Sequence, residues 1–96
     1  MKTFGKYIRE LREIQGLPLR KVAAALDIDT SILSKIERNE RRATTKMLPV
    51  FSKTPNEPEK NIQIEFIKST IFSDLGELEY LETGLRENLN LLKENL

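Results

Sequence analysis

The stretch LRKVAAALDIDTSILSKIER, residues 19–38, has the strongest structural pattern in the chain. Its apolar residues recur at intervals of three and four, which is the periodicity of helices and not of strands. Residues 27–29, Asp-Ile-Asp, interrupt the pattern, and the last of them is a good N-cap for a following helix. We therefore expect helices over about 19–26 and 30–38, joined by a three-residue turn.

The residues around this turn fit a helix-turn-helix unit, in which two short helices cross closely. Ala23 is small where the two helices must approach, and Ile28 plugs the turn. Leu33 and Ile36 form the inward face of the second helix. Because any three-helix bundle shows part of this pattern, the unit alone indicates a compact all-α domain.

The flanking segments also have helical periodicity, and no part of the sequence alternates as strands do. Thr3 can cap a first helix that ends at Gly16. The inner face of that helix is expected to consist of Phe4, Ile8, Leu11 and Ile14. A short fourth helix should start within residues 46–48, because Pro49 is tolerated only near a helix start.

The segment TPNEPEKN, residues 54–61, contains two prolines and is the clearest boundary in the chain. We predict a helix-turn-helix DNA-binding domain over 1–56 and a helical dimerisation or interaction region over 57–96. The fold class is then all-α, a compact bundle of four to five helices with a C-terminal helical extension. A break is expected between Ser73 and Gly76, before the last helix.

Apolar residues at helical spacing in the C-terminal region are the candidate dimer interface. They are Ile64, Ile67, Ile71, Leu78, Leu81, Leu85 and Leu92. Asn88 occupies a seam position among the leucines, where a polar residue can fix the register of two helices. The alternative is that the leucines fold back on the isoleucines of the same chain, and both hold if two helical hairpins form a four-helix interface.

The composition excludes several classes of function. The 96 residues include no Cys and no His, so disulfides, thiolate metal sites and the commonest general base are missing. No Gly-rich phosphate loop is present, so we expect no enzyme, metal or cofactor. No apolar run approaches the roughly 20 residues that a membrane helix needs, and the first residues lack the apolar block of a signal peptide. We expect a soluble cytoplasmic protein.

The formal net charge of +1 hides two halves of opposite sign. Residues 1–56 contain twelve Lys and Arg against six Asp and Glu, whereas residues 57–96 contain four against nine. Such asymmetry indicates that the first half faces a polyanion and the second half does not. Chance segregation of charges on two solvated surfaces is the simpler alternative.

The run IRELREIQGLPLRKVAAALDIDTSILSKIERNERRAT, residues 8–44, resembles the Cro/Xre-type helix-turn-helix family of phage repressors and bacterial regulators. The resemblance covers about residues 3–53, and it extends in particular to the small controllers of restriction–modification systems. It implies a compact helical domain that docks its third helix in the major groove of double-stranded DNA. Such proteins usually bind a two-fold symmetric operator as dimers.

The resemblance assigns base contacts to exposed residues of the third helix, and the i, i+4 spacing of Ser31 and Lys35 agrees with it. The candidates for base contact are Thr30, Ser31, Ile32, Ser34 and Lys35. A lysine can donate to guanine O6 and N7, hydroxyls bond several bases, and a methyl group can contact thymine. For Ser34, a backbone bond or a phosphate contact is equally well supported.

Basic residues beside this helix are expected to contact phosphates. They are Arg20, Lys21, Arg38, Arg41 and Arg42, and the alternative for the last three is a solvated loop. Arg12 and Glu37 match a family pair that ties the first helix to the third. The chain departs from the family at Pro18 and Leu19, where a polar phosphate ligand is common, and at Asp27 and Asn39, where Gly is common.

Together these observations favour a sequence-specific transcriptional regulator that binds a two-fold symmetric operator as a homodimer and has no enzymatic activity. The alternative is a protein-interaction module, such as an antitoxin, whose acidic C-terminal helices bind a partner protein. RNA polymerase or another protein is a candidate partner of that acidic half in either case.

Overall fold

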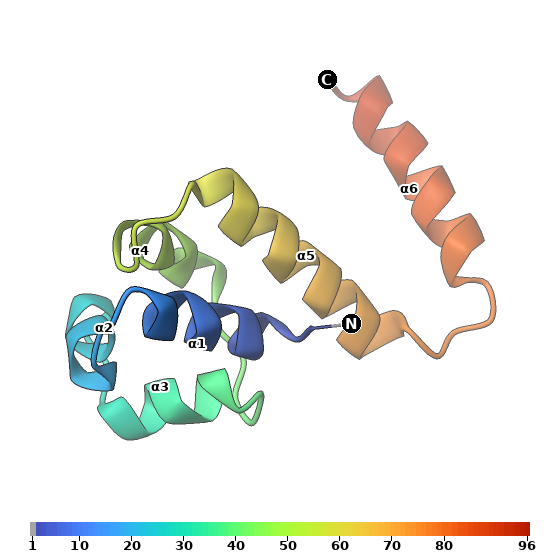
Figure 1. Cartoon of the computed structure of the whole chain (residues 1–96). Helices are drawn as coiled ribbons and strands as arrows, with labels where there is room; N and C mark the ends of the chain where they lie inside the picture. The colour runs from blue at the N-terminus through green and yellow to red at the C-terminus, as the bar shows by residue number, and fades with distance from the viewer. Residues whose placement is uncertain (1) are drawn as a thin grey trace.

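The computed structural model describes residues 2–96, and every regular element in that range is a helix. In chain order the elements are α1 (Phe4–Ile14), α2 (Leu19–Leu26), α3 (Thr30–Glu37), the short 3₁₀ helix η1 (Thr45–Met47), α4 (Leu48–Lys53), α5 (Glu59–Leu75) and α6 (Leu81–Glu94). The first five α-helices pack into one bundle, and α6 projects away from it (Figure 1). The predicted all-α fold is confirmed.

Local signals fix most of the helix ends. The Thr3 hydroxyl accepts a hydrogen bond from the Lys6 amide at 3.2 Å, and Gly16 follows α1 with a φ of +66°. Asp27 and Asn39 adopt left-handed backbone conformations after α2 and α3, with φ of 57° and 63°. Short polar side chains tolerate this conformation, so each residue does here what glycine does more often.

Two local expectations need correction. Asp29 occupies the N-cap position of α3, but its carboxylate makes no capping hydrogen bond, and its backbone carbonyl accepts from Leu33 instead. Ile14, expected on the inner face of α1, is 81% exposed. Gln15, the residue after α1, makes the contact with the rest of the chain instead. Its side-chain amide exchanges two hydrogen bonds with the backbone of Asn56.

The core lies where α1 meets the other bundle helices. Its buried apolar residues are Phe4, Ile8, Val22, Ala23, Leu33, Ile36, Ala43, Leu48, Phe51 and Ile62. The ring of Phe4 packs edge-on against Phe51 and Phe66, with centroid separations of 5.8 and 5.3 Å. These contacts join α1 to α4 and α5, so one aromatic cluster connects the start of the chain to its second half.

The helix α5 belongs to the same bundle as the helices before residue 56. Ile62 is fully buried, and the Ser69 hydroxyl accepts a hydrogen bond from the backbone amide of Phe4 at 3.0 Å. The chain turns at the predicted boundary, but α5 then packs against α1 and α4 across it. The packed body therefore extends to Leu75.

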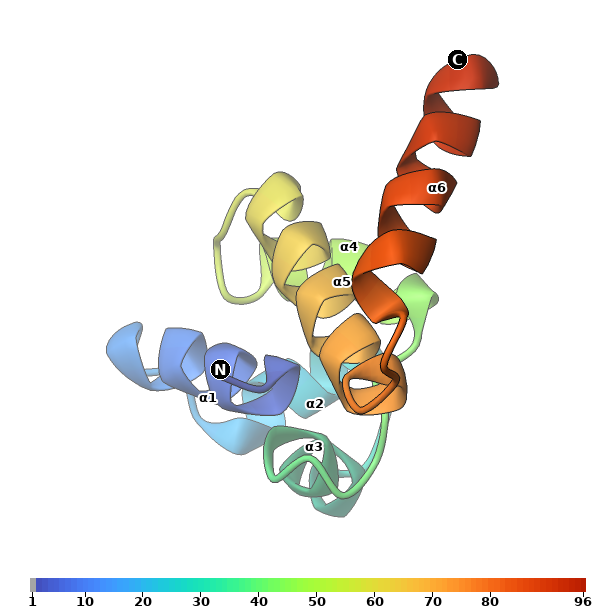
Figure 2. The ribbon, with the colours of Figure 1, turned by 90° about the vertical axis from the view of Figure 1, so that its right-hand side faces the viewer.

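The helix α6 stands apart from the bundle in two perpendicular views (Figures 1 and 2). None of its residues is buried. The helix α5 ends at Leu75, within the expected break, but α6 begins only at Leu81, so Leu78 lies in the connecting turn instead of the helix. The sequence also left open that α6 folds back onto the isoleucines of α5. In this structure α6 does not pack against them. No helix among residues 2–96 has the length and apolar character needed to cross a membrane.

Candidate nucleic-acid interface

The recognition-helix candidate α3 lies at the edge of the bundle, at the end opposite the tip of α6 (Figures 1 and 2). Leu33 and Ile36 are buried and fix one face of α3 against α1 and α2. Thr30, Ser31 and Lys35 are exposed on the remaining surface. The helix therefore presents two hydroxyls and one ammonium group away from the body of the protein.

The other two candidates for base contact are less accessible. Ile32 is half-buried and packs against the hydrophobic core. Ser34 is also half-buried. The structure thus brings Thr30, Ser31 and Lys35 together as one exposed group, and it gives Ile32 a packing role.

Arg12 and Glu37 form a nearly buried ion pair between α1 and α3. The Arg12 Nε and Nη2 atoms donate to the two carboxylate oxygens of Glu37 at 2.7 and 3.0 Å. Arg12 Nη1 also donates to the Leu17 carbonyl at 2.9 Å, so the same guanidinium holds the turn before α2. The hydrogen bonds to Glu37 raise the pKa of Arg12. The Arg12 guanidinium therefore connects α1, the turn before α2 and the end of α3.

Gly5 allows α1 to approach the end of α3 closely. A Cβ atom at this position would lie 2.1 Å from the Ile36 carbonyl oxygen and 2.8 Å from that of Glu37. Only glycine leaves room for this backbone contact. The sequence interpretation missed this role, although a glycine inside a helical pattern is a signal for it.

Three of the predicted phosphate-binding residues are exposed and make no salt bridge within the described chain. They are Arg20 and Lys21 in the first turn of α2, and Arg41 in the loop after α3. Lys35 on α3 shares this property. These four cations are therefore available to a polyanion without the loss of an existing ion pair.

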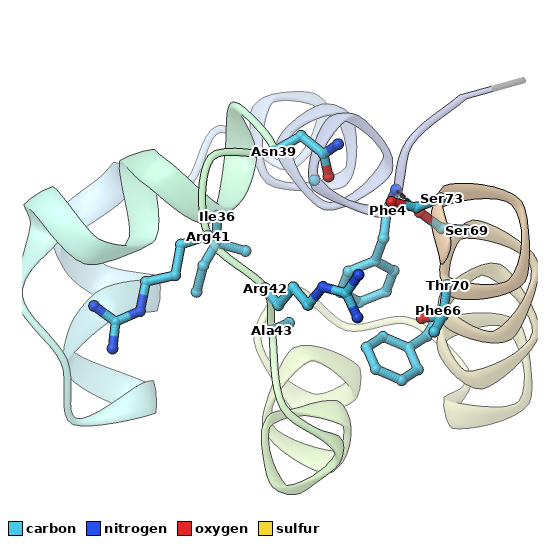
Figure 3. A pocket seen from close by; sticks show the side chains of 11 residues that line it. Phe4, Ile36, Asn39, Arg41, Arg42, Ala43, Phe66, Ser69, Thr70 and Ser73 are labelled. Atoms are coloured by element: carbon cyan, nitrogen blue, oxygen red, sulfur yellow. Dashed lines mark hydrogen bonds between the residues drawn. The ribbon is translucent and has the colours of Figure 1, made fainter. Parts of the chain in front are cut away.

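The remaining two predicted phosphate ligands are already paired with carboxylates. Arg38 Nε lies 2.6 Å from Glu40, its neighbour in the loop. Arg42 makes a two-point contact with Asp74 of α5, one bond of which measures 2.8 Å. Figure 3 shows the Arg42 side chain directed toward α5, whereas Arg41 points away from it. No spacing in the sequence indicates the Asp74 contact, because the two residues are 32 positions apart.

A small pocket lies beneath this loop, between α1, the end of α3 and α5 (Figure 3). Its volume is about 110 Å³, well below the roughly 300 Å³ of typical ligand pockets. No group of metal-ligating side chains occurs in residues 2–96. The exposed side of α3 and the cations beside it form the surface at this end of the bundle that suits a polyanion.

Comparison with known proteins agrees with this geometry. A family model described as helix-turn-helix matches residues 8–59, more than half of the chain. The matched segment includes α2, the turn and α3, together with every residue proposed for base or phosphate contact. No curated protein and no solved structure gave a match.

Proposed function

This chain belongs to the Cro/Xre-type helix-turn-helix family, a family of DNA-binding regulatory domains, and from that premise we propose that it is a sequence-specific transcriptional regulator. It binds double-stranded DNA as a homodimer on a two-fold symmetric operator, with α3 in the major groove. The observation that carries the proposal is the exposed group of Thr30, Ser31 and Lys35 on the free face of α3.

This group has the chemistry for reading base edges. The ammonium group of Lys35 donates to guanine O6 and N7, and the hydroxyls of Thr30 and Ser31 bond several bases. No amide side chain lies in this group, so adenine is read weakly. Specificity then rests on a guanine in each half-site and on DNA shape.

Phosphate contacts surround this reading group. Arg20, Lys21 and Arg41 are exposed and free to meet the DNA backbone. Arg38 and Arg42 join them only by leaving Glu40 and Asp74. Phosphate contacts set the position and orientation of the helix, and base contacts then select the sequence.

Dimerisation supplies a second reading head, that is, a second helix-turn-helix bundle with its own α3. Five of the predicted interface residues are exposed, namely Ile64 and Ile67 on α5, Leu78 in the connecting turn, and Leu85 and Leu92 on α6. The other two, Ile71 and Leu81, are half-buried. One short reading helix provides limited affinity, and a second copy on the adjoining half-site multiplies it. The proposed dimer interface therefore lies in the C-terminal part of the chain.

Selection of bound duplexes from a random pool tests this function. The expected result is an inverted repeat with a guanine in each half-site and half-sites spaced by about one helical turn. Recovery of an unrelated set of sequences would overturn sequence-specific binding. Recovery of single, unpaired half-sites would overturn the homodimer alone.

A further inference from the structure

The helix α6 is an amphipathic helix, and no residue among 2–96 buries its apolar face. Leu85, Leu89 and Leu92 are 38, 50 and 56% exposed. An isolated helix of 14 residues is only marginally stable in water, because most helical stability in proteins comes from packing an apolar face. The leucines of α6 therefore need a cover that the described part of the chain does not provide.

The spacing of these residues is that of a coiled-coil seam. Within α6, the residues Leu81, Leu85, Asn88 and Leu92 follow one another at intervals of four, three and four. The opposite side of the helix is polar, with Thr83, Arg86, Glu87, Asn90 and Lys93. A helix with this seam packs most favourably on another helix that has the same repeat. A second copy of α6 is such a helix.

Gly84 adds an independent observation. Glycine inside a helix costs about 1 kcal/mol relative to alanine. A Cβ atom at residue 84 would meet nothing within 4 Å, so no contact within the chain requires glycine there. In a parallel heptad pair, Gly84 flanks the seam opposite Leu89 of the partner subunit. The missing side chain leaves room for that leucine.

We propose that two copies of α6 pair in parallel about a two-fold axis that runs along the helices, so that each seam residue meets its own counterpart. This inference rests on the homodimer proposed above and specifies its interface. The parallel direction places Asn88 against Asn88 of the partner subunit, where two amides can bond each other inside an apolar seam. An antiparallel pair would leave this amide facing another residue type.

The position of α6 in the molecule favours the same direction. In two perpendicular views α6 runs away from the end of the bundle that carries α3 (Figures 1 and 2). A two-fold axis along α6 therefore leaves both α3 helices at the same end of the dimer, facing one DNA molecule. An antiparallel pair would send the two reading heads to opposite ends.

The charges near the start of α6 set where the pair begins. Glu77, Glu79 and Glu82 form an acidic group before the first cation of the helix, Arg86. Two such groups repel when they are side by side, so the connecting turns before Leu81 diverge and each leads back to its own bundle. The groove of about 490 Å³ between the end of α5 and the start of α6 is lined partly by Leu81, Leu85 and Asn88, so the seam of α6 forms one wall of it.

Cysteine cross-linking of the full chain tests the proposal, because the natural sequence contains no Cys. Leu85→Cys and Leu92→Cys should each form a disulfide-linked dimer on mild oxidation, since each meets its counterpart in the seam. Asn90→Cys is the matched control on the outer face, and it should stay unlinked. Cross-linking at only one of the two seam positions overturns the parallel pair, because counterparts meet at one level only in an antiparallel pair.

Sedimentation of a second pair of variants separates this inference from the proposed function. Leu92→Glu should weaken dimerisation at least about tenfold, because it buries a charge in the seam. Asn90→Glu adds the same charge outside the seam and should leave the dimer intact. If both variants dimerise as strongly as the natural chain, the interface lies elsewhere. This result would overturn the α6 pair but not the homodimer. A natural chain that is monomeric at all concentrations overturns the homodimer itself.

Discussion

The bundle of α1 to α5 and the arm α6 are both made of amphipathic helices, yet they satisfy their apolar faces differently. In the bundle, Ile8, Leu33, Phe51 and Ile62 are fully buried within one chain. In the arm no residue is buried, and its leucines face solvent. The bundle therefore buries its apolar faces within one chain, whereas the arm leaves its apolar face exposed within residues 2–96.

The same contrast holds for polar contacts. The Arg12–Glu37 pair is nearly buried and bonds through three donor atoms. The Arg86–Glu82 pair of the arm is exposed and sits one turn apart on the same helix. Burial makes the first pair a fixed part of the fold, and solvent screening leaves the second with little effect on stability.

Charge-neutral variants of the two acids give the largest expected difference. Glu37→Gln leaves Arg12 as an uncompensated buried charge, and we expect a loss of about 3–5 kcal/mol in the free energy of unfolding. Glu82→Gln should change it by less than about 0.5 kcal/mol. Urea denaturation followed by circular dichroism measures both. Equal effects would mean that the Arg12–Glu37 pair does not stabilise the bundle.

The two helical glycines give the next largest effect. Gly5→Ala forces a Cβ atom into the Ile36 carbonyl, and we expect a loss of about 3 kcal/mol because α1 must shift away from α3. In the Leu92→Glu background, where the α6 pair is weakened, Gly84→Ala meets open space and should raise the helicity of the arm, by about 1 kcal/mol in propensity. Thermal unfolding distinguishes them, and a harmless Gly5→Ala would contradict the close helix contact.

Substitutions of two cations, Lys35 and Arg41, should affect DNA binding in different ways. Lys35→Ala should lower discrimination at one base position by about 1–3 kcal/mol, because it removes a donor to guanine. Arg41→Ala should weaken all duplexes about equally and reduce the slope of affinity against salt by about one. Fluorescence anisotropy with the selected site and a mutated site measures both. The reverse pattern would show that the two roles are exchanged.

The smallest effect is expected for the ion pair between Asp74 of α5 and Arg42 in the loop after α3. Asp74→Asn removes the negative partner of Arg42, which is then free to meet phosphate. We expect affinity for all duplexes to rise a few-fold, with a salt slope steeper by about one. Arg42→Ala in the Asp74→Asn background is the control and should cancel the gain. An unchanged slope in Asp74→Asn would assign Arg42 a purely structural role.

The helices around the α2–α3 turn could be predicted from the sequence because their signals are local. The cap at Thr3, the left-handed residues Asp27 and Asn39 and the proline near the start of α4 act over one helical turn. The apolar spacing of α2 and α3 also predicted which residues are buried. Such signals depend on neighbours in the sequence and not on the final arrangement of the helices.

The features that the sequence did not predict depend on contacts between distant segments. The fit of Gly5 against Ile36, the bond from Phe4 to Ser69 and the Arg42–Asp74 pair join residues 31 to 65 positions apart. The place of α5 in the bundle also follows from such contacts. A proline-rich turn separates sequence segments, but it does not decide whether they pack together.

The salt dependence of DNA binding by the natural chain tests the central claim most directly, that the free face of α3 and its surrounding cations bind duplex DNA. If about six phosphates are neutralised, the logarithm of affinity should fall against the logarithm of salt concentration with a slope on the order of −5. A flat dependence, or no binding to any duplex at low salt, would contradict the account.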